Sequence, residues 1–186
     1  MENNNVMRKP KIEKVVLNVG GVGEKLEKGL ILLQKFSGKK PVKIVAKKRI
    51  PTWGVRPGLE LGTKVTIRGA EAEAIIKRAL PAINNTLKEK QVRPNTVSFG
   101  VPEYIEIPGL EYIREVGIMG FEMTVTFVRS GRRVGLKKVK KGRVRRQDVT
   151  VEEIIKFMED TFKTKIVRKI KNDSKWLEKN NKTIEK

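Results

Sequence analysis

Residues 129–146 carry the densest positive charge in the sequence. Ten basic side chains fall among these eighteen positions, with no acidic residue between them: Arg129, Arg132, Arg133, Lys137, Lys138, Lys140, Lys141, Arg143, Arg145 and Arg146. Like charges at this density repel one another unless anions neutralise them, so the segment predicts a polyanionic partner, with nucleic acid as the first expectation. A solvated or disordered basic loop is the alternative. Interleaved glycines and apolar residues favour instead an extended, hairpin-like basic arm that orders on its partner.

A second basic segment surrounds a tryptophan. Between Lys39 and Gly58 the sequence places Trp53 among seven basic residues and no acidic one: Lys39, Lys40, Lys43, Lys47, Lys48, Arg49 and Arg56. An exposed ring can stack on a base while nearby cations bind phosphates, an arrangement typical of RNA contact. The alternative is that Trp53 anchors the loop to its own domain, because Trp side chains are usually mostly buried.

Few other residues could support catalysis or cofactor binding. The chain has no Cys and no His, which excludes disulfides and thiolate sites and removes the usual acid–base group at neutral pH. The glycines at 20–23 match neither the dinucleotide-binding nor the P-loop spacing, and Glu24 would repel a phosphate there. Glutamates at 71, 73, 152 and 153 lie where helices should begin and so favour the helix dipole. We expect no enzyme activity and no cofactor.

Composition indicates a globular protein with a strong basic surplus. The 186 residues have a formal net charge of +21 and 38% hydrophobic content, enough for one folded domain with extensions. No apolar run approaches the roughly 20 residues of a membrane helix, and residues 1–11 lack the apolar stretch of a signal peptide. We therefore expect a soluble, cytoplasmic protein. Binding to an anionic membrane surface is a weaker alternative.

Apolar periodicity predicts the elements that position these basic segments. Alternation predicts strands buried on one face over 12–19, 63–68, 97–101 and 121–127, with a further short strand over 42–45. Helical spacing predicts helices over about 26–36 and 70–88, the second kinked at Pro81. Thr150 and Glu153 form a capping box that begins a third helix. The basic loop over 46–62 and the stretch over 102–120 are expected to be irregular.

These elements predict an α+β fold of two layers. Helices should cover one face of a mostly antiparallel sheet and leave the other face open and polar. Lys64, Thr66 and Arg68 share that open face, and Lys14 and Asn18 can join it, so it could contact phosphates and sugar hydroxyls. We expect an N-terminal extension over 1–10, one domain over 11–164 and a basic C-terminal tail over 165–186.

Several motifs together resemble one protein family. The sequences IEKVVLNVG, SGKKPV, AKKRI, GTKVTIRG, SFGV and GIMGFEMTVTFVRSGRRV occur in this order, and the chain from about Arg8 to Phe162 resembles the ribosomal large-subunit protein five family. The arm that begins VRSGRRV is similar to the archaeal and eukaryotic branch of that family.

The resemblance implies a structural ribosomal protein that binds 5S rRNA in the central protuberance of the large subunit. Family members are also expected to contact large-subunit rRNA, to approach the P-site tRNA and to help bridge to a protein of the small-subunit head. Asn18 and Thr66 match positions that hydrogen-bond 5S rRNA, and Lys39 replaces a common Gln, which implies a phosphate contact instead. The implied RNA-binding set is Asn18, Lys39, Lys40, Lys64, Thr66 and Arg68, and the implied tRNA-facing set is Lys47, Lys48, Arg49, Trp53 and Arg56.

A free-standing, non-specific nucleic-acid-binding protein of the architectural or chaperone type is the alternative function. Such a protein would bind duplexes without preference and would need no ribosome. Neither function requires a membrane or a homo-oligomer, and co-sedimentation with large ribosomal subunits separates the two.

Overall fold

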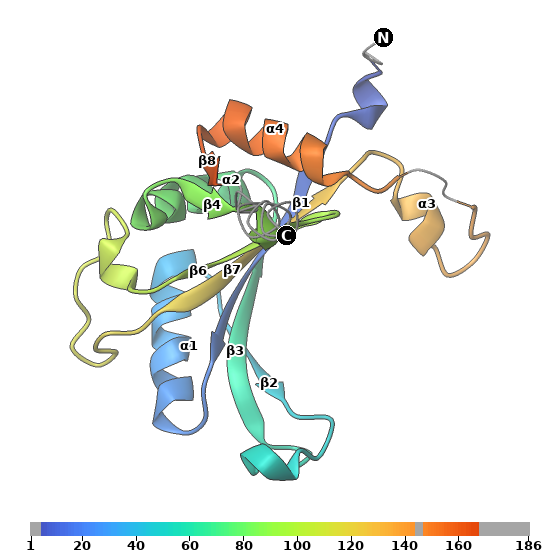
Figure 1. Cartoon of the computed structure of the whole chain (residues 1–186). Coiled ribbons are helices and arrows are strands. Elements are labelled where there is room, and N and C mark those ends of the chain that lie inside the picture. The colour runs from blue at the N-terminus through green and yellow to red at the C-terminus, as the bar shows by residue number, and fades with distance from the viewer. Residues whose placement is uncertain (1–4, 144–146, 168–186) are drawn as a thin grey trace, which may run out of the picture.

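The structure is a computed structural model that describes residues 5–143 and 147–167 (Figure 1). Six strands form an antiparallel sheet in the order β2-β3-β1-β7-β6-β5. Their bounds are β1 (Lys11–Gly20), β2 (Val42–Val45), β3 (Glu60–Ile67), β5 (Val92–Arg93), β6 (Thr96–Val101) and β7 (Phe121–Val128). The short strands β4 (Thr86–Lys88) and β8 (Lys165–Val167) form a separate parallel pair. The helices are α1 (Glu24–Ser37), α2 (Ala70–Ala79), α3 (Arg133–Leu136) and α4 (Val151–Phe162).

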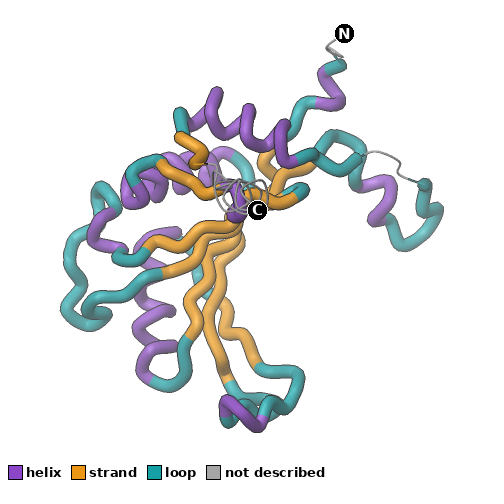
Figure 2. Tube along the Cα trace, in the orientation of Figure 1, coloured by secondary structure: helices purple, strands orange, loops and turns teal. Residues whose placement is uncertain are grey.

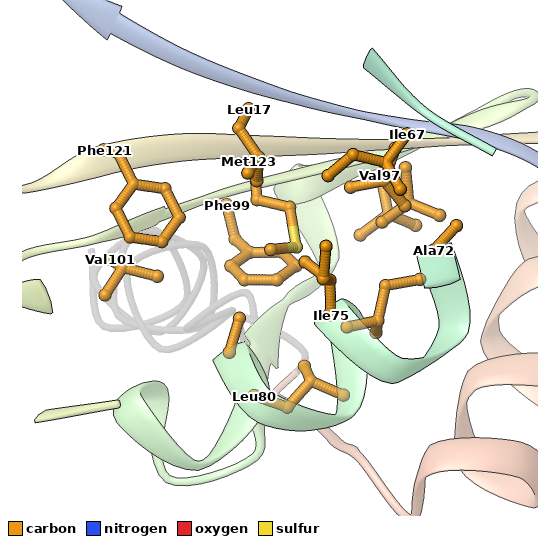
Figure 3. Packing of buried hydrophobic residues seen from close by; sticks show 14 of the residues in the cluster. Leu17, Ile67, Ala72, Ile75, Leu80, Val97, Phe99, Val101, Phe121 and Met123 are labelled. Atoms are coloured by element: carbon orange, nitrogen blue, oxygen red, sulfur yellow. The ribbon is translucent and has the colours of Figure 1, made fainter. Parts of the chain in front are cut away.

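The core lies between one face of the large sheet and the helices. Alternate side chains of the central strands, such as Leu17, Met123 and Phe127, are fully buried there. In Figure 3 the strand side chains point toward α2, which contributes Ala72 and Ile75 to the same cluster. The two-layer α+β fold predicted from the alternating pattern is therefore confirmed.

Two helix ends follow directly from the local sequence. Gly38 ends α1 in the left-handed conformation (φ 66°), where a side chain would be strained, and its N–H donates to the carbonyl of Gln34. At the start of α4 the predicted capping box is present. The backbone N–H of Glu153 donates to Thr150 Oγ1 (3.4 Å), and the N–H of Thr150 donates to Glu153 Oε2 (3.1 Å).

The predicted long helix over 70–88 is wrong in its second half. α2 ends at Ala79, and a 3-10 turn follows over Leu80–Ile83. Pro81 cannot continue the helical hydrogen bonding, and Asn84 adopts a positive φ of 53° that turns the chain away. The apolar residue Leu87, which fits the helical spacing, is instead buried on β4.

The third strand begins earlier than its predicted start at residue 63. β3 starts at Glu60 and pairs with β2, with Ile44 opposite Gly62. Gly62 lies within this strand and not in a loop. A Cβ at this position would lie 2.6 Å from the carbonyl oxygen of Val19, so only glycine allows this approach of β1 and β3. The irregular part of the predicted basic loop over 46–62 therefore ends at Leu59.

The chain beyond α4 also differs from the prediction. Residues 165–167, expected to belong to the C-terminal tail, form β8 and pair with β4. This pairing joins segments about eighty positions apart and could not be read from a three-residue pattern. The remainder of the predicted tail, 168–186, lies outside the described residues. Within the described ranges, no helix is both long enough and apolar enough to cross a membrane.

Candidate nucleic-acid interface

The face of the sheet opposite the core carries polar and charged side chains. On β1 the residues Lys14, Val16 and Asn18 alternate with the buried ones and are partly exposed. On β3 the residues Lys64 and Thr66 are exposed in the same way. We call this surface the open face. It is completed on β7 and β6 by Glu122, Thr124, Thr126, Ser98 and Gly100.

Strand register brings the two implied 5S-binding residues close together. Asn18 lies opposite Lys64 on β3, and Thr66 lies opposite Val16, two residues away on β1. Asn18 and Thr66 are therefore diagonal neighbours on one face, about 7–8 Å apart by ordinary sheet geometry. Lys64 stands beside both, so one cation and two hydrogen-bonding side chains converge within a single patch.

Two of the other predicted cations, Arg68 and Lys39, are paired with carboxylates. Arg68 follows β3, is well exposed and lies 3.9 Å from a carboxylate oxygen of Glu13. Lys39 forms an ion pair with Glu71 in the first turn of α2, whereas Lys40 is exposed. Exposed pairs of this kind are weak, so a phosphate can compete for either cation.

The loop between β2 and β3 is ordered by its own backbone and presents a tryptophan. A 3-10 turn over Pro51–Trp53 is closed by two backbone hydrogen bonds between Ile50 and Val55 (2.9 and 3.0 Å). Val55 is buried at this turn, while Trp53 is 79% exposed. Of the two alternatives, the structure therefore favours exposure, and Val55 is the anchor. Figure 2 shows this loop at the end of the two strands, and its four cations are exposed: Lys47, Lys48, Arg49 and Arg56.

The basic arm projects from the body on the opposite side from the β6–β7 loop (Figure 1). The sequence predicts a hairpin-like arm, but the described part contains the short helix α3 and no strand beyond β7. Its apolar residues Val134, Leu136 and Val139 are exposed and do not contribute to the core. Seven of the ten predicted cations lie at the described surface of the arm: Arg132, Arg133, Lys137, Lys138, Lys140, Lys141 and Arg143. Arg145 and Arg146 lie outside the described residues.

Arg129 differs from the rest of the predicted arm. Its side chain is 9% exposed, and Nη2 donates to both carboxylate oxygens of Glu153 at 2.6 and 2.5 Å. Burial raises the pKa of Glu153, but the hydrogen bonds and charge of Arg129, with the bonds from Thr150, outweigh it, and the net pKa lies below the ordinary value. The segment 129–146 has no internal counter-charge, but α4 supplies one for Arg129. The sequence assigns Arg129 to the basic arm, but this pairing buries its side chain, so Arg129 is not one of the exposed cations of the arm.

Asn95 fixes the other end of the arm, and sequence reasoning did not identify it. Its amide donates to Asp148 (2.8 Å) and its Oδ1 accepts from the N–H of Val149 (2.7 Å). Asn95 itself adopts φ 63° in the turn between β5 and β6, a conformation that Asn tolerates better than most residues. The NT dipeptide after Arg93-Pro94 signals a turn, but its long-range contacts have no signature in the sequence.

The loop between β6 and β7 has the opposite charge to the rest of the surface. Residues 102–120 contain four glutamates and one basic residue, and all five are exposed: Glu103, Glu106, Glu111, Glu115 and Arg114. Ile105, Tyr112 and Ile118 are exposed beside them. Such a surface repels phosphates but fits a basic protein with apolar side chains. No group of acidic side chains within the described ranges is arranged to hold a metal ion.

Comparison with known proteins agrees with this architecture. The model of the ribosomal protein L5 family matches residues 5–56, and the model of the C-terminus of the same ribosomal family matches residues 60–164. The large ribosomal subunit protein uL5 of Nanoarchaeum equitans is 44% identical over 165 residues, covering 87% of this chain and 98% of the relative. The uL5 proteins of Sulfurisphaera tokodaii and Sulfolobus acidocaldarius are 40% and 41% identical, each covering 88% of this chain and 95% and 94% of the relative.

These matches define the class as ribosomal structural proteins, which are not enzymes. The chain belongs to the ribosomal protein L5 family of the large ribosomal subunit, and the relatives named above are archaeal. It is accordingly a component of cytoplasmic ribosomes.

Proposed function

We propose that the open face binds 5S rRNA in the central protuberance of the large subunit. The observation that carries the proposal is the register of β1 and β3, which places Asn18 and Thr66 diagonally on one face beside Lys64. Amide and hydroxyl groups can recognise ribose hydroxyls and base edges, whereas the lysine supplies a phosphate contact. The face is wide enough for this role because four strands contribute to it.

The remaining basic segments extend the interface beyond 5S rRNA. The ordered loop that carries Trp53 approaches the P-site tRNA, where the exposed ring can stack and Lys47 and Lys48 can bind phosphates. The basic arm contacts large-subunit rRNA. The exposed glutamates of the loop between β6 and β7 bridge to a basic protein of the small-subunit head, because their charge and the exposed apolar side chains beside them suit a protein and repel a phosphate backbone.

The test compares Asn18→Ala and Thr66→Ala with Thr161→Ala, an exposed residue near the end of α4. Binding to 5S rRNA is measured in competition with an unrelated structured RNA of equal length. Each open-face variant should lose about 1–3 kcal/mol of discrimination, as a lost polar readout contact does, while the control keeps it. Unchanged selectivity in both open-face variants would show that this face is not the specific interface.

Attachment to rRNA by charge alone, without specific recognition of 5S rRNA, is the competing function. Such a protein would bind many RNAs equally and would leave the ribosomal particle as salt is added. Sedimentation of the full chain with large ribosomal subunits at a salt concentration that removes non-specific binding separates the two functions. Retention on the particle supports the proposal, and release at the same salt as from random RNA opposes it.

A further inference from the structure

A shallow hollow of about 700 Å³, largely open to solvent, lies at one end of the open face, where β1, β6 and β7 meet the β6–β7 loop. Asn18, Gly20, Gly100, Gly120 and Glu122 line it together with neighbouring residues. Glu122 stands in the middle of this row, because it lies opposite Asn18 on β1 and opposite Gly100 on β6. The hollow is thus lined by the amide of Asn18, the carboxylate of Glu122 and the backbone of three glycines.

The packing of the chain explains Gly120 but not Gly20 or Gly100. A Cβ at Gly120 would lie 2.4 Å from the carbonyl oxygen of Pro102, so the fold requires glycine there. A Cβ at Gly20 or at Gly100 would meet nothing within 4 Å, and neither residue has a positive φ. Glycine weakens the interior of a strand and often marks a site where another molecule approaches the backbone closely. Gly100 therefore indicates room for a ligand.

Glu122 indicates what kind of ligand enters. In the part of the chain that the structure describes, its exposed carboxylate has no hydrogen bond or ion pair. A carboxylate repels phosphate, so the group that it meets on an RNA-binding face must present hydrogen-bond donors, which are the ribose hydroxyl and the N–H groups of the bases. Guanine carries two adjacent donors, N1–H and the N2 amine, on its Watson–Crick edge, and one carboxylate can accept from both.

We propose that this hollow binds an unpaired guanine base of rRNA. The two oxygens of Glu122 accept from N1–H and N2–H, the amide of Asn18 contacts the same nucleotide, and Gly20 and Gly100 leave space for the ring. The base must be unpaired because its Watson–Crick edge is occupied in a duplex. This inference rests on the proposed function, since it requires the open face to bind RNA.

The first test replaces Glu122 by Gln in the full chain and uses Glu152→Gln, an exposed glutamate on α4, as the charge-matched control. Each unpaired guanosine of 5S rRNA is replaced in turn by inosine, which lacks the N2 amine. Wild type and E152Q should lose affinity on the order of tenfold at one such position, as for a lost base contact. E122Q should bind intact RNA more weakly by a similar factor and be insensitive to that replacement.

The direction of the change in RNA affinity distinguishes recognition of guanine by Glu122 from a general effect of charge. Both variants raise the net charge by one unit, so counterion release alone predicts equal or tighter binding of every RNA. Weaker and less selective binding by E122Q alone supports the proposal. Equal, uniform tightening by both variants, with no position that responds to inosine, overturns it.

The second test replaces Gly100 by Ala. The added methyl group meets no atom of the chain, so thermal unfolding should occur at the same or a higher temperature than in wild type. If the hollow holds a base, RNA affinity should nevertheless fall. Unchanged affinity in a stably folded G100A protein would contradict the proposal.

A short RNA distinguishes failure of this site from failure of the 5S assignment. A uridine-rich strand of about eight nucleotides, within the usual span of a single-strand site, carries one guanosine or one inosine. Wild type should prefer the guanosine strand and E122Q should not, whichever rRNA is the natural partner. Lack of preference in wild type overturns the guanine site even if 5S rRNA is bound specifically. A preference here with no selectivity for 5S rRNA overturns the proposed function instead.

Discussion

Arg129 should stabilise the folded domain and contribute little to RNA affinity, unlike the exposed cations of the same segment. The perturbation is Arg129→Met, which keeps much of the aliphatic bulk and removes both hydrogen bonds to Glu153. The matched control is Arg133→Met, the same substitution at an exposed position on α3. Glu153→Gln gives an independent variant that removes the charge from the other partner.

The expected loss of unfolding free energy follows from the burial of the Arg129–Glu153 ion pair. Breaking a fully buried ion pair costs about 3–5 kcal/mol, because the remaining charge loses its partner. The Glu153 side chain is 40% exposed, so solvent screens part of this loss, and we expect about 2 kcal/mol for R129M. The E153Q variant keeps an acceptor for the arginine and for the helix cap, and about 1 kcal/mol is expected. R133M should stay within about 0.5 kcal/mol of wild type.

The assay measures urea unfolding and the salt dependence of RNA binding on the same proteins. A loss of about 2 kcal/mol lowers the unfolding midpoint by about 1 M at typical urea slopes. R133M, if the arm contacts phosphate, should reduce the slope of log K against log salt by about 0.7–0.9, while R129M should leave this slope unchanged. If R129M unfolds like wild type and its salt slope falls as much as that of R133M, Arg129 is a phosphate contact and its pairing with Glu153 does not stabilise the fold.

Further predictions concern pH, the exposed tryptophan and the buried tyrosine. Because the pKa of Glu153 is lowered in the folded state, its contribution to stability is present at neutral pH and is lost as pH falls through the folded-state pKa. The difference in unfolding free energy between wild type and E153Q should therefore shrink in acid. An unchanged difference would contradict the pairing. Trp53→Ala should weaken tRNA binding, measured by fluorescence anisotropy, by about 1–3 kcal/mol without altering thermal unfolding, because the exposed ring is lost as a stacking surface. W53F should retain most of the tRNA affinity. Loss of folding in W53A would show that the ring anchors the loop. Tyr104→Phe should destabilise the domain by about 1–3 kcal/mol in urea unfolding, because the buried N–H of Ile113 loses its 2.8 Å acceptor; an unchanged midpoint would show that water replaces the hydroxyl.

Much of the fold could be predicted because its strongest signals are local. The alternation along β1, β6 and β7 marks their buried faces, and the capping box at Thr150 and Glu153 marks the start of α4. The errors occur where distant contacts override the local pattern. Leu87 fits a helix by spacing, but Pro81 ends the helix and pairing with β8 makes its segment a strand.

The candidate interface was predictable to the same extent. Alternation alone places Asn18, Lys64 and Thr66 on one face, and the register then makes them neighbours. Charge density alone cannot distinguish Arg129 from the exposed cations of the arm, because its partner Glu153 lies on a different element. The exposure of Trp53 depends on the bridge between Ile50 and Val55, which the loop sequence does not reveal.

Specific recognition of 5S rRNA is the central claim, and a salt titration tests it most directly. Binding of the full chain to 5S rRNA is followed beside binding to an unrelated structured RNA of equal length, from low salt until both complexes dissociate. Electrostatic attraction serves both RNAs equally and weakens with added salt, whereas hydrogen bonds from the open face serve only one. If the open face recognises 5S rRNA, the preference for 5S rRNA should persist at high salt. Parallel loss of binding to both RNAs would contradict it and favour a non-specific nucleic-acid-binding protein.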